Sequence, residues 1–330
     1  MKTGSTNPSI RQAFTDFLHT LSEARSANTA RTYANGLDMF ELVLTEKGID
    51  VETSPVSQLQ EDTIIWLISE LKYLSPASER LYLTAVTQFF EYLAGEELAD
   101  VNLSSIKLLI RQRARRPGVR LPQFPVKDIQ TVLRHADQLI SSPCADDTER
   151  LRNLRDRAFL ITLADTGLRV HEACNLRRGD IDWNESKAVV IGKGNREAIV
   201  RFSKRSQDAI QIYLKARAEM DGATGRPLTS MPIFARHDKG AGKNIQAMTT
   251  ATGRNIVTQR VSEALGAEAV GTITPHSFRH YFVTTVLRAS GNLKMAQALA
   301  RHQNIAVTTR YAHLNDDELD RGYYQIFDEK

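Results

Sequence analysis

The stretch Ala188-Val-Val-Ile-Gly-Lys-Gly-Asn-Arg-Glu-Ala-Ile-Val-Arg-Phe202 decides the fold class of this chain. Two runs rich in β-branched residues flank a glycine turn, which is the pattern of an antiparallel hairpin. Outward from the hairpin, apolar residues follow helical periodicity over residues 127–139, 150–165, 207–220, 255–265, 275–288, 293–301 and 316–327. Residues 236–253 are rich in glycine and polar residues and predict a surface loop. Residues 126–330 are therefore predicted to form a mainly helical, mixed α/β domain with one small antiparallel sheet.

The first hundred residues show only helical periodicity. Apolar stripes run over residues 10–21, 33–44, 64–71 and 82–93, and the last of these helices is opened by Ser75-Pro76 and closed near Gly95. The second helix is expected to start at Asn28 or Thr29. Residues 10–100 thus predict a four-helix domain, preceded by a disordered N-terminus over residues 1–9. The whole chain is predicted to be mainly α, with two domains joined by residues 101–125.

The segment that joins the two domains carries a one-sided charge. Between residues 101 and 127 there are seven basic residues, no acidic residue and three prolines. Such a segment is either a solvated tether or a strand that lies along a phosphate backbone, where each Lys or Arg contact releases counterions. The charge favours the second interpretation. The predicted contacts to nucleic acid are Arg111, Arg113, Arg115, Arg116 and Arg120.

Length and composition narrow the class of protein. The 330 residues, 42% of them apolar and 25% charged, are typical of a globular chain with about two domains. No apolar run approaches the roughly 20 residues of a membrane span, and residues 1–9 do not have the composition of a signal peptide. The two cysteines, Cys144 and Cys174, exclude a disulfide scaffold and a four-cysteine zinc site. We expect a cytoplasmic protein with free thiols and no membrane association.

A first candidate for anion binding lies at a predicted helix start. Thr274 can cap a helix that begins at Pro275, which places His276 and Arg279 on one face of the opening turn. The free N–H groups of a helix start attract anions, and a guanidinium and an imidazole beside them make a phosphate clamp. A solvated basic helix start is an equal alternative from these residues alone.

A second candidate lies at a predicted helix break. Gly167 ends one helix, and Arg169 follows with Glu172 three residues later. An arginine held by Glu172 can aim its planar fork at a phosphate, although a purely structural ion pair is a common alternative. Lys193, at the tip of the hairpin, is either a solvated turn residue or a proton donor that reaches into a groove.

The last candidates are a histidine and a tyrosine nine residues apart, His302 and Tyr311. They can converge on one point across a helix break. Tyrosine has a pKa of about 10, so it needs nearby cations or a base before it attacks a phosphodiester. Tyr281, Tyr323 and Tyr324 are alternative candidates, and each of these tyrosines can also be a packed core residue.

The order and spacing of these signals together resemble the tyrosine recombinase (phage integrase) family. The shared pattern is an arginine in a Thr-Gly-Leu-Arg break, a lysine in a hairpin, His-x-x-Arg, a histidine and a tyrosine, and the resemblance extends from about residue 120 to the end of the chain. The upstream four-helix domain looks like the SAM-like core-binding domain of that family. The proportions are most similar to the two-domain, Xer-type site-specific recombinases.

The resemblance implies six catalytic residues and one supporting acid: Arg169, Lys193, His276, Arg279, His302, Tyr311 and Glu172. In this pattern the arginines clamp the scissile phosphate, the lysine protonates the 5′-oxygen leaving group, and the histidines bind the phosphate and assist proton transfer. The tyrosine is the nucleophile and forms a 3′-phosphotyrosine link. Because guanidinium and imidazole groups supply the positive charge, no cofactor, metal or nucleotide is implied.

The resemblance also implies partners. These are double-stranded DNA with inverted-repeat core sites and three further copies of the chain in a tetramer on two sites. An accessory protein is a further partner found with some members of the family. In such tetramers the segment after the tyrosine, here the tail over residues 315–330, is exchanged between copies. One alternative, type IB topoisomerase-like nicking and closing, uses the same residues without exchange of partner strands. The other is a DNA-binding accessory protein that has lost catalysis. One departure from the family is Arg301, where glycine is frequent; it suggests either a DNA contact or an altered helix start.

Overall fold

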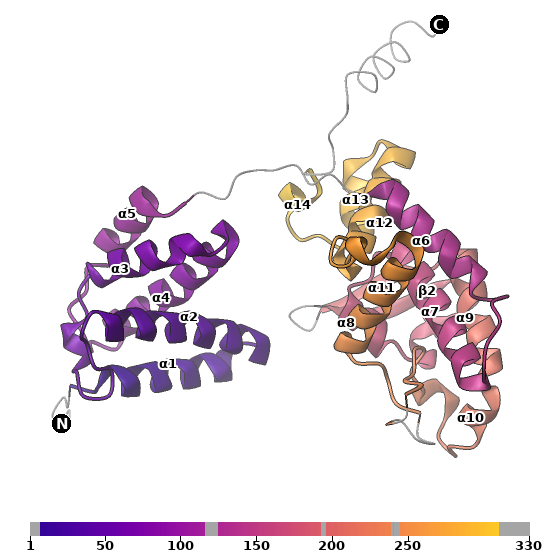
Figure 1. Cartoon of the computed structure of the whole chain (residues 1–330), viewed down its shortest axis with the longest axis horizontal. Helices are drawn as coiled ribbons and strands as arrows, with labels where there is room; N and C mark the ends of the chain where they lie inside the picture. Colours follow the sequence, from indigo (N-terminus) through magenta and orange to yellow (C-terminus); the bar gives the residue numbers. More distant parts are fainter. Residues whose placement is uncertain (1–6, 116–124, 193–195, 239, 241–244, 310–330) are drawn as a thin grey trace, which may run out of the picture. The chain divides into compact units, whose positions relative to one another are not determined.

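The structure is a computed structural model that describes residues 7–115, 125–192, 196–238, 240 and 245–309. The chain forms two compact units, Met1–Arg120 and Leu121–Lys330, whose elements are labelled in Figure 1. Lys193, Tyr311, Arg116, Arg120 and the tail over residues 315–330 lie outside the described residues.

The first unit contains the four predicted helices. They are α1 (Ile10–Ala24), α2 (Ala27–Glu46), α3 (Thr63–Glu70) and α4 (Pro76–Gly95). The second of them begins earlier than predicted, because the side chain of Ser26 accepts from the Thr29 backbone and caps α2. Ser9 caps α1 in the same way and bridges to Pro55, so this end of the predicted disordered segment is part of the fold. The core contains a group of packed aromatic rings, among them Phe14 against Phe89 at 4.8 Å between centroids.

The predicted linker is partly a fifth helix of this unit, α5 (Leu103–Arg113). Asn102 caps it, Ile106 is fully buried in the core, and the helix packs against α3 and α4. Lys107, one of the basic residues of the segment, pairs with Glu91 of α4 at 2.8 Å. Residues 103–113, which we predicted to belong to the interdomain linker, are therefore a helix of the first unit, because the apolar face of this stretch outweighs its charge.

Arg115 is bound to the first unit in the structure. Its backbone N–H and its Nε donate to the buried carboxylate of Glu79 at 2.9 and 2.5 Å, and its Nη2 donates to the carbonyls of Leu71 and Leu74. Burial alone would raise the pKa of Glu79, but the hydrogen bonds from Arg115 and Lys72 outweigh it and lower that pKa. The guanidinium that we predicted to contact DNA thus holds the end of α5 to α4.

The second unit is mainly helical and carries a three-stranded antiparallel sheet of order β1-β2-β3, as the fold class required. Its helices are α6 (Val126–Gln138), α7 (Asp147–Thr166), α8 (Val170–Asn175), α9 (Lys204–Ala216), α10 (Ala218–Gly222), α11 (Thr250–Leu265), α12 (Pro275–Ser290), α13 (Leu293–Ala300) and α14 (Ile305–Thr309). The strands are β1 (Ile181–Asp182), β2 (Lys187–Gly192) and β3 (Arg196–Arg201). β2 and β3 form the predicted hairpin, with Val189 opposite Ile199.

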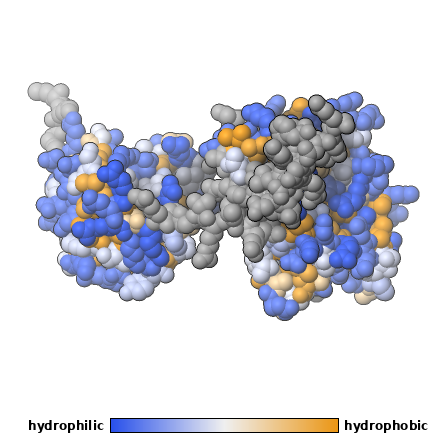
Figure 2. Space-filling view, turned by 90° about the horizontal axis from the view of Figure 1, so that it is seen from above, coloured by the Kyte–Doolittle hydropathy of each residue, from blue (hydrophilic) through white to orange (hydrophobic). Residues whose placement is uncertain are grey.

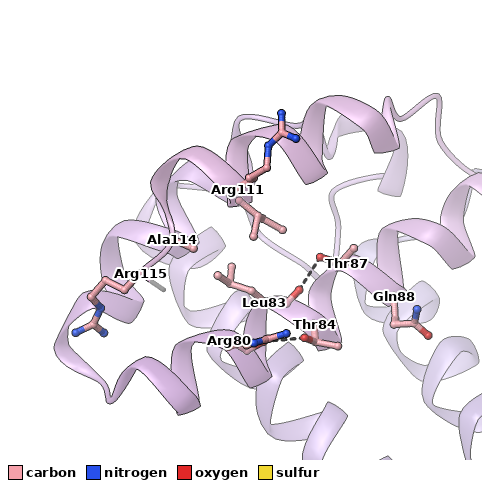
Figure 3. Close-up of a pocket in the computed structure, with 9 residues that line it drawn as sticks. Arg80, Leu83, Thr84, Thr87, Gln88, Arg111, Ala114 and Arg115 are labelled. Atoms are coloured by element: carbon pink, nitrogen blue, oxygen red, sulfur yellow. Dashed lines mark hydrogen bonds between the residues drawn. The ribbon is translucent and has the colours of Figure 1, made fainter. Parts of the chain in front are cut away.

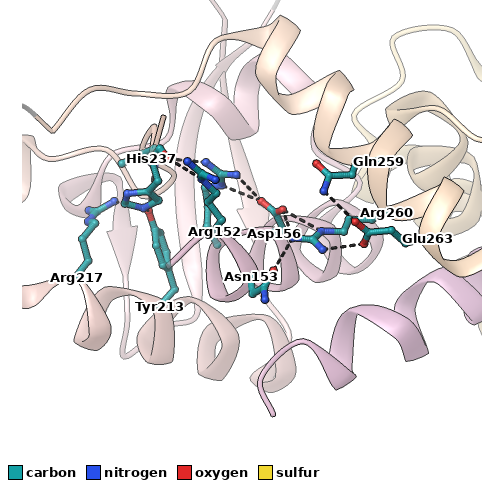
Figure 4. Close-up of polar contacts among 11 residues, drawn as sticks. Arg152, Asn153, Asp156, Tyr213, Arg217, His237, Gln259, Arg260 and Glu263 are labelled. Atoms are coloured by element: carbon teal, nitrogen blue, oxygen red, sulfur yellow. Dashed lines mark hydrogen bonds and ion pairs between the residues drawn. The ribbon is translucent and has the colours of Figure 1, made fainter. Parts of the chain in front are cut away.

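α7 is the central helix of this unit. Every residue from Ala158 to Ala164 is buried, and the helix packs against α6, α8, α9 and α12. It also brings charge into the core, because Asp156 accepts from Arg155 and from Arg260 of α11 (Figure 4). A buried carboxylate shared by two guanidiniums fixes α7 and α11 together, and the site described below is built on the C-terminal end of α7.

Part of the predicted surface loop over residues 236–253 is buried. Ile245 is 4% exposed and packs with Met231 and Ala235, while Met248 lies in the main core. His237 lies beside Tyr213 (Figure 4). The Tyr213 hydroxyl accepts from the backbone N–H of Ala235 and from Arg217 Nη1, which occupies both of its lone pairs, so its own hydrogen is directed at His237 Nε2, 2.7 Å away. His237 is therefore a neutral hydrogen-bond acceptor in the core. Its partner Tyr213 lies 24 residues away in the chain, so the contact could not be inferred from the polar composition of the segment.

Acidification is expected to destabilise the second unit through His237. Its pKa is lowered from 6.5 to about 3, first by burial and then by the nearby Arg155, Arg217 and Arg152. Between these values the unfolded chain binds the extra proton, so this contribution to stability is complete above pH 6.5 and is lost as the pH falls toward 3. At about pH 5 the loss is roughly 2 kcal/mol. Urea unfolding of wild type and His237→Gln at about pH 7.5 and about pH 5 measures it; an equal loss in both proteins would contradict the assignment.

The surface of both units is largely hydrophilic on the face seen in Figure 2, with apolar residues in scattered groups. The most exposed apolar side chains of the sheet are Val189, Ile191 and Ile199, which all lie on one face of the hairpin. No helix in the described part of the chain has both the length and the apolar character that crossing a membrane requires.

Candidate active site

The site begins where α7 ends. Gly167 closes α7 in a left-handed conformation with φ +61°, and a Cβ at this position would lie 2.4 Å from Cδ1 of Phe282. Only glycine fits this turn, because both the backbone angle and the space exclude a side chain. Leu168 is then fully buried and anchors the chain, and Arg169 follows as the cap of α8. The predicted break therefore exists and presents Arg169, whose side chain is 38% exposed.

Glu172 is the buried carboxylate of the site. It accepts from the Arg169 backbone N–H at 2.8 Å and from Arg169 Nη1 at 2.9 Å. Its Oε2 also pairs with Arg301 Nη2 at 3.0 Å. Burial alone would raise the pKa of Glu172, but Arg301 and the hydrogen bonds from Arg169 lower it below its ordinary value. Glu172 is thus an ionised group that contacts Arg169, and it has a second cationic partner, Arg301, that was not predicted.

The predicted helix start at Thr274-Pro275 is the start of α12. Arg279, in its first turns, is only 3% exposed. Its Nη1 donates to the carbonyl of Gly167 at 2.5 Å, and its Nη2 donates to the carbonyl of Ala300 at the end of α13. Arg279 therefore connects the α7–α8 break, α12 and α13, which are far apart in the sequence.

The two predicted histidines lie in the field of the same arginines. Burial first, and then Arg279 and Arg169, lower the pKa of His276, and the same causes in the same order lower the pKa of His302 to about 4. His302 is oriented by a 2.9 Å contact between its Nδ1 and the hydroxyl of the buried Thr308. Both imidazoles are consequently neutral near pH 7 and able to accept a proton.

His280 lies behind His276, with the ring centroids 4.1 Å apart and the planes at 73°. Burial, His276 and Arg279 lower the pKa of His280 to about 3. A neutral ring in this position packs against His276 and restricts its orientation. The structure thus gives His280 a packing role beside His276.

The arrangement is suited to a phosphate. Arg169, Arg279, His276 and His302 come from three separate segments of the chain and act on one another electrostatically. Their positive charge is held in place by Glu172 and by backbone carbonyls, so an anion that enters needs no reorganisation of the site. Within the residues that the structure describes, no group of three histidine, cysteine, aspartate or glutamate side chains gathers to hold a metal ion.

Four of the six predicted catalytic residues and Glu172 are thus brought together, while Lys193 and Tyr311 lie outside the described residues. The contact of the site that the sequence analysis missed is that of Arg301 with Glu172. The position of Arg301 directly before His302 was the available signal, but its partner Glu172 lies 129 residues away in the chain.

Comparison with known proteins bears on the same residues. The phage integrase family matches residues 124–318, and the N-terminal SAM-like domain of phage integrases matches residues 14–97. The chain belongs to the phage integrase family. The resemblance predicted from the six-residue pattern is confirmed, and so is its tyrosine recombinase class.

Relatives cover almost the whole chain. The tyrosine recombinase XerC of Pediococcus pentosaceus is 26% identical over 308 residues, which are 93% of this chain and 94% of that protein. XerC of Actinobacillus pleuropneumoniae is 29% identical over 310 residues, 93% and 90% of the two chains. XerD of Brucella melitensis is 27% identical over 314 residues, 93% and 94% of the two chains. The predicted similarity to Xer-type recombinases is therefore confirmed.

Two solved structures share the fold of this phage integrase. The Tn1549 transposon integrase in complex with transposon right end DNA matches with a TM-score of 0.64 and 17% identity, over 97% of this chain and all of that one. The XerH site-specific recombinase bound to its difH substrate matches with a TM-score of 0.63 and 18% identity, over 89% and 78%. Both support the mainly helical class with a small sheet.

Proposed function

We propose that this phage integrase is a site-specific DNA recombinase that cuts and rejoins strands through Tyr311. The observation that carries the proposal is that Arg279 joins the α7–α8 break, where Glu172 holds Arg169, to the end of α13 just before His302, with His276 in the field of the same two arginines. Each of these residues is at the position that the family pattern requires, and the sequence supplies Lys193 and Tyr311 at the remaining two.

The chemical step follows from these groups. The phenolic oxygen of Tyr311 attacks the phosphorus of the scissile phosphodiester and forms a 3′-phosphotyrosine bond. The bond from phosphorus to the 5′-oxygen breaks, and Lys193 gives a proton to that oxygen. A neutral imidazole, His276 or His302, accepts the proton that Tyr311 loses. The 5′-hydroxyl of a second strand reverses the step, so the energy of the cut bond is kept and no nucleotide is consumed.

The two arginines supply the electrostatic part of the step. Negative charge builds on the non-bridging phosphate oxygens as the tyrosine attacks, and guanidiniums already in place stabilise it. The field that lowers the pKa of the histidines also favours the ionised form of a tyrosine brought to this point. The role of Glu172 is to hold the guanidinium of Arg169 in the orientation that this contact needs.

The proposed partner is double-stranded DNA with inverted-repeat core sites, and the solved structure of the Tn1549 transposon integrase is likewise a complex with DNA. Further proposed elements are a tetramer on two sites, formed through exchange of residues 315–330, and an accessory protein. The free thiols of Cys144 and Cys174 agree with the cytoplasmic location that we propose.

In the first unit, α4 and α5 present a hollow with Arg80 and Arg111 among its lining side chains (Figure 3). We assign these two arginines to the phosphate backbone of DNA.

Arg111 and Arg115 form a matched pair that tests this assignment. Arg111→Ala is expected to reduce the slope of log K for DNA against log salt by about 1, because one phosphate contact is lost. Arg115→Ala is expected to lower the free energy of unfolding by roughly 2 kcal/mol, since Glu79 loses charged hydrogen bonds in the core. Gel-shift titrations at several salt concentrations and urea unfolding measure the two effects. An unchanged slope in Arg111→Ala would remove this residue from the DNA contacts.

The function is tested with supercoiled plasmids that carry one or two copies of a bound DNA site, incubated with the protein in EDTA. The proposal predicts exchange between two sites and therefore excision or inversion of the DNA between them. Relaxation without exchange at either plasmid would favour the topoisomerase-like alternative. Specific binding with neither reaction would favour the catalytically silent accessory protein.

A further inference from the structure

Arg301 has a backbone conformation that favours glycine. Its φ of 58° lies in the left-handed region, and it ends α13. Of the described residues other than glycine, two more have positive φ, Glu97 and Ser186, and neither belongs to the site. A side chain in this conformation costs free energy that glycine avoids. Strain of this kind persists where the side chain does something that glycine cannot.

The side chain of Arg301 is directed to the buried carboxylate of the site. It is 11% exposed, and its Nη2 lies 3.0 Å from Oε2 of Glu172, the group that holds Arg169. Its Nε is buried without a hydrogen-bond partner among the described residues. A left-handed backbone and an incompletely bonded buried guanidinium both reduce stability, so packing does not explain why an arginine is present.

The charge balance shows what Arg301 adds. A lone Arg169–Glu172 pair has a net charge of zero. The negative carboxylate therefore cancels much of the electrostatic attraction between Arg169 and an incoming phosphate. With Arg301 on Oε2 and Arg169 on Oε1, the three groups carry a net charge of +1. Glu172 keeps its hydrogen bonds to Arg169, while the positive charge of Arg301 neutralises the carboxylate. Arg301 also repels Arg169, and a phosphate beside Arg169 relieves that repulsion.

The neighbouring residues in the chain place this effect at the reaction. The carbonyl of Ala300 accepts from Arg279, and the next residue after Arg301 is His302. Of three consecutive residues, Ala300 thus contacts Arg279, and Arg301 contacts Glu172. The third, His302, is one of the residues assigned to the phosphate. A change at residue 301 acts on Arg169 through Glu172 and needs no contact of its own with DNA.

We propose that Arg301 is a positioning residue that neutralises Glu172 and so leaves Arg169 its positive charge for the scissile phosphate. The inference rests on the proposed function of Arg169. It gives Arg169 a second positively charged residue that acts on it through Glu172, at a position where the family frequently has glycine.

Arg301→Lys and Arg301→Met test the proposal, because the two side chains have similar length and the same backbone strain but differ in charge. The rate of covalent adduct formation at saturating protein is measured on a nicked duplex that traps the cut strand, together with DNA affinity and the melting temperature. Arg301→Met is expected to cleave about 10- to 100-fold more slowly with DNA affinity within about threefold of wild type. Arg301→Lys is expected to stay within about fivefold of the wild-type rate. Equal rates in the Lys and Met variants would overturn the proposal.

Further variants separate a positioning role from a structural one. Arg301→Gly removes both the ion pair and the left-handed strain, so it should melt above Arg301→Met, which keeps the strain, and still cleave as slowly. In a Glu172→Gln background the loss from Arg301→Met should shrink, because no carboxylate remains to be neutralised. Arg288→Ala, at an exposed position of α12, controls for the loss of one positive charge. No adduct from wild type would contradict the proposed function itself, whereas a wild-type rate in Arg301→Met would contradict only the inference.

Discussion

Tyr311→Phe should bind DNA as tightly as wild type and form no covalent adduct with it. Removing the hydroxyl removes the nucleophile, and no other group of the site replaces it, so the cleavage rate should fall by about 10⁴-fold or more. The phosphate clamp is unchanged, which keeps the affinity within about twofold. Denaturing gels of radiolabelled duplex measure the adduct, and native gels measure the affinity.

Tyr281→Phe is the control for this experiment. Tyr281 is a half-buried residue of α12 that packs against the core, so its hydroxyl should be dispensable for cleavage. Full activity is expected in this variant. An adduct that persists in Tyr311→Phe and disappears in Tyr281→Phe would move the nucleophile to α12.

The second large effect is expected for Arg169→Lys. A lysine keeps the charge, but its single ammonium cannot hold Glu172 and also present a planar fork to the phosphate. We expect the cleavage rate to fall by about 10²- to 10³-fold, while DNA affinity changes only a few-fold, because the contact is strongest in the transition state. Single-turnover cleavage on the trapping duplex and gel-shift titration measure the two quantities.

Arg177→Lys, at an exposed position just after α8, is the matched control and should cleave like wild type. If Arg169→Lys lost affinity as strongly as rate, Arg169 would be a ground-state DNA contact with no special part in the chemical step. The same outcome would remove the basis for the role of Arg301.

The elements that the sequence predicted best are those in which local signals agree. Ser75-Pro76 and Gly95 bound a helix that exists at these residues, and the glycine turn predicts the β2–β3 hairpin. Gly167 is similar, because only glycine fits a turn with φ +61° against Phe282. The break that presents Arg169 could therefore be located before any tertiary contact was known.

Where the sequence prediction failed, two signals competed or the deciding contact was distant. The charge of residues 101–127 concealed the apolar face of α5, whose Ile106 is buried against helices of the first unit. β1 has only two residues, too few for any periodicity. The bond between Arg115 and Glu79 was not predicted, because Glu79 lies 36 residues away and cannot be inferred from local charge.

The candidate site shows the same division. The residue types and their order indicated Arg169, His276, Arg279 and His302 from the sequence. Their convergence depends on Arg279 reaching Gly167, 112 residues earlier, and the end of α13. The left-handed backbone of Arg301 and its contact with Glu172 are properties of the folded chain alone.

The most direct test of the account is to identify the atom that carries the DNA. The protein is incubated in EDTA with the duplex it binds best among fragments flanking its own gene, the adduct is digested with trypsin, and the peptide–nucleotide link is located by mass spectrometry. The account predicts a 3′-phosphate on Tyr311 and a free 5′-hydroxyl on the other side of the cut. A link to another residue, a 5′-phosphate link, or specific binding without any adduct would contradict it.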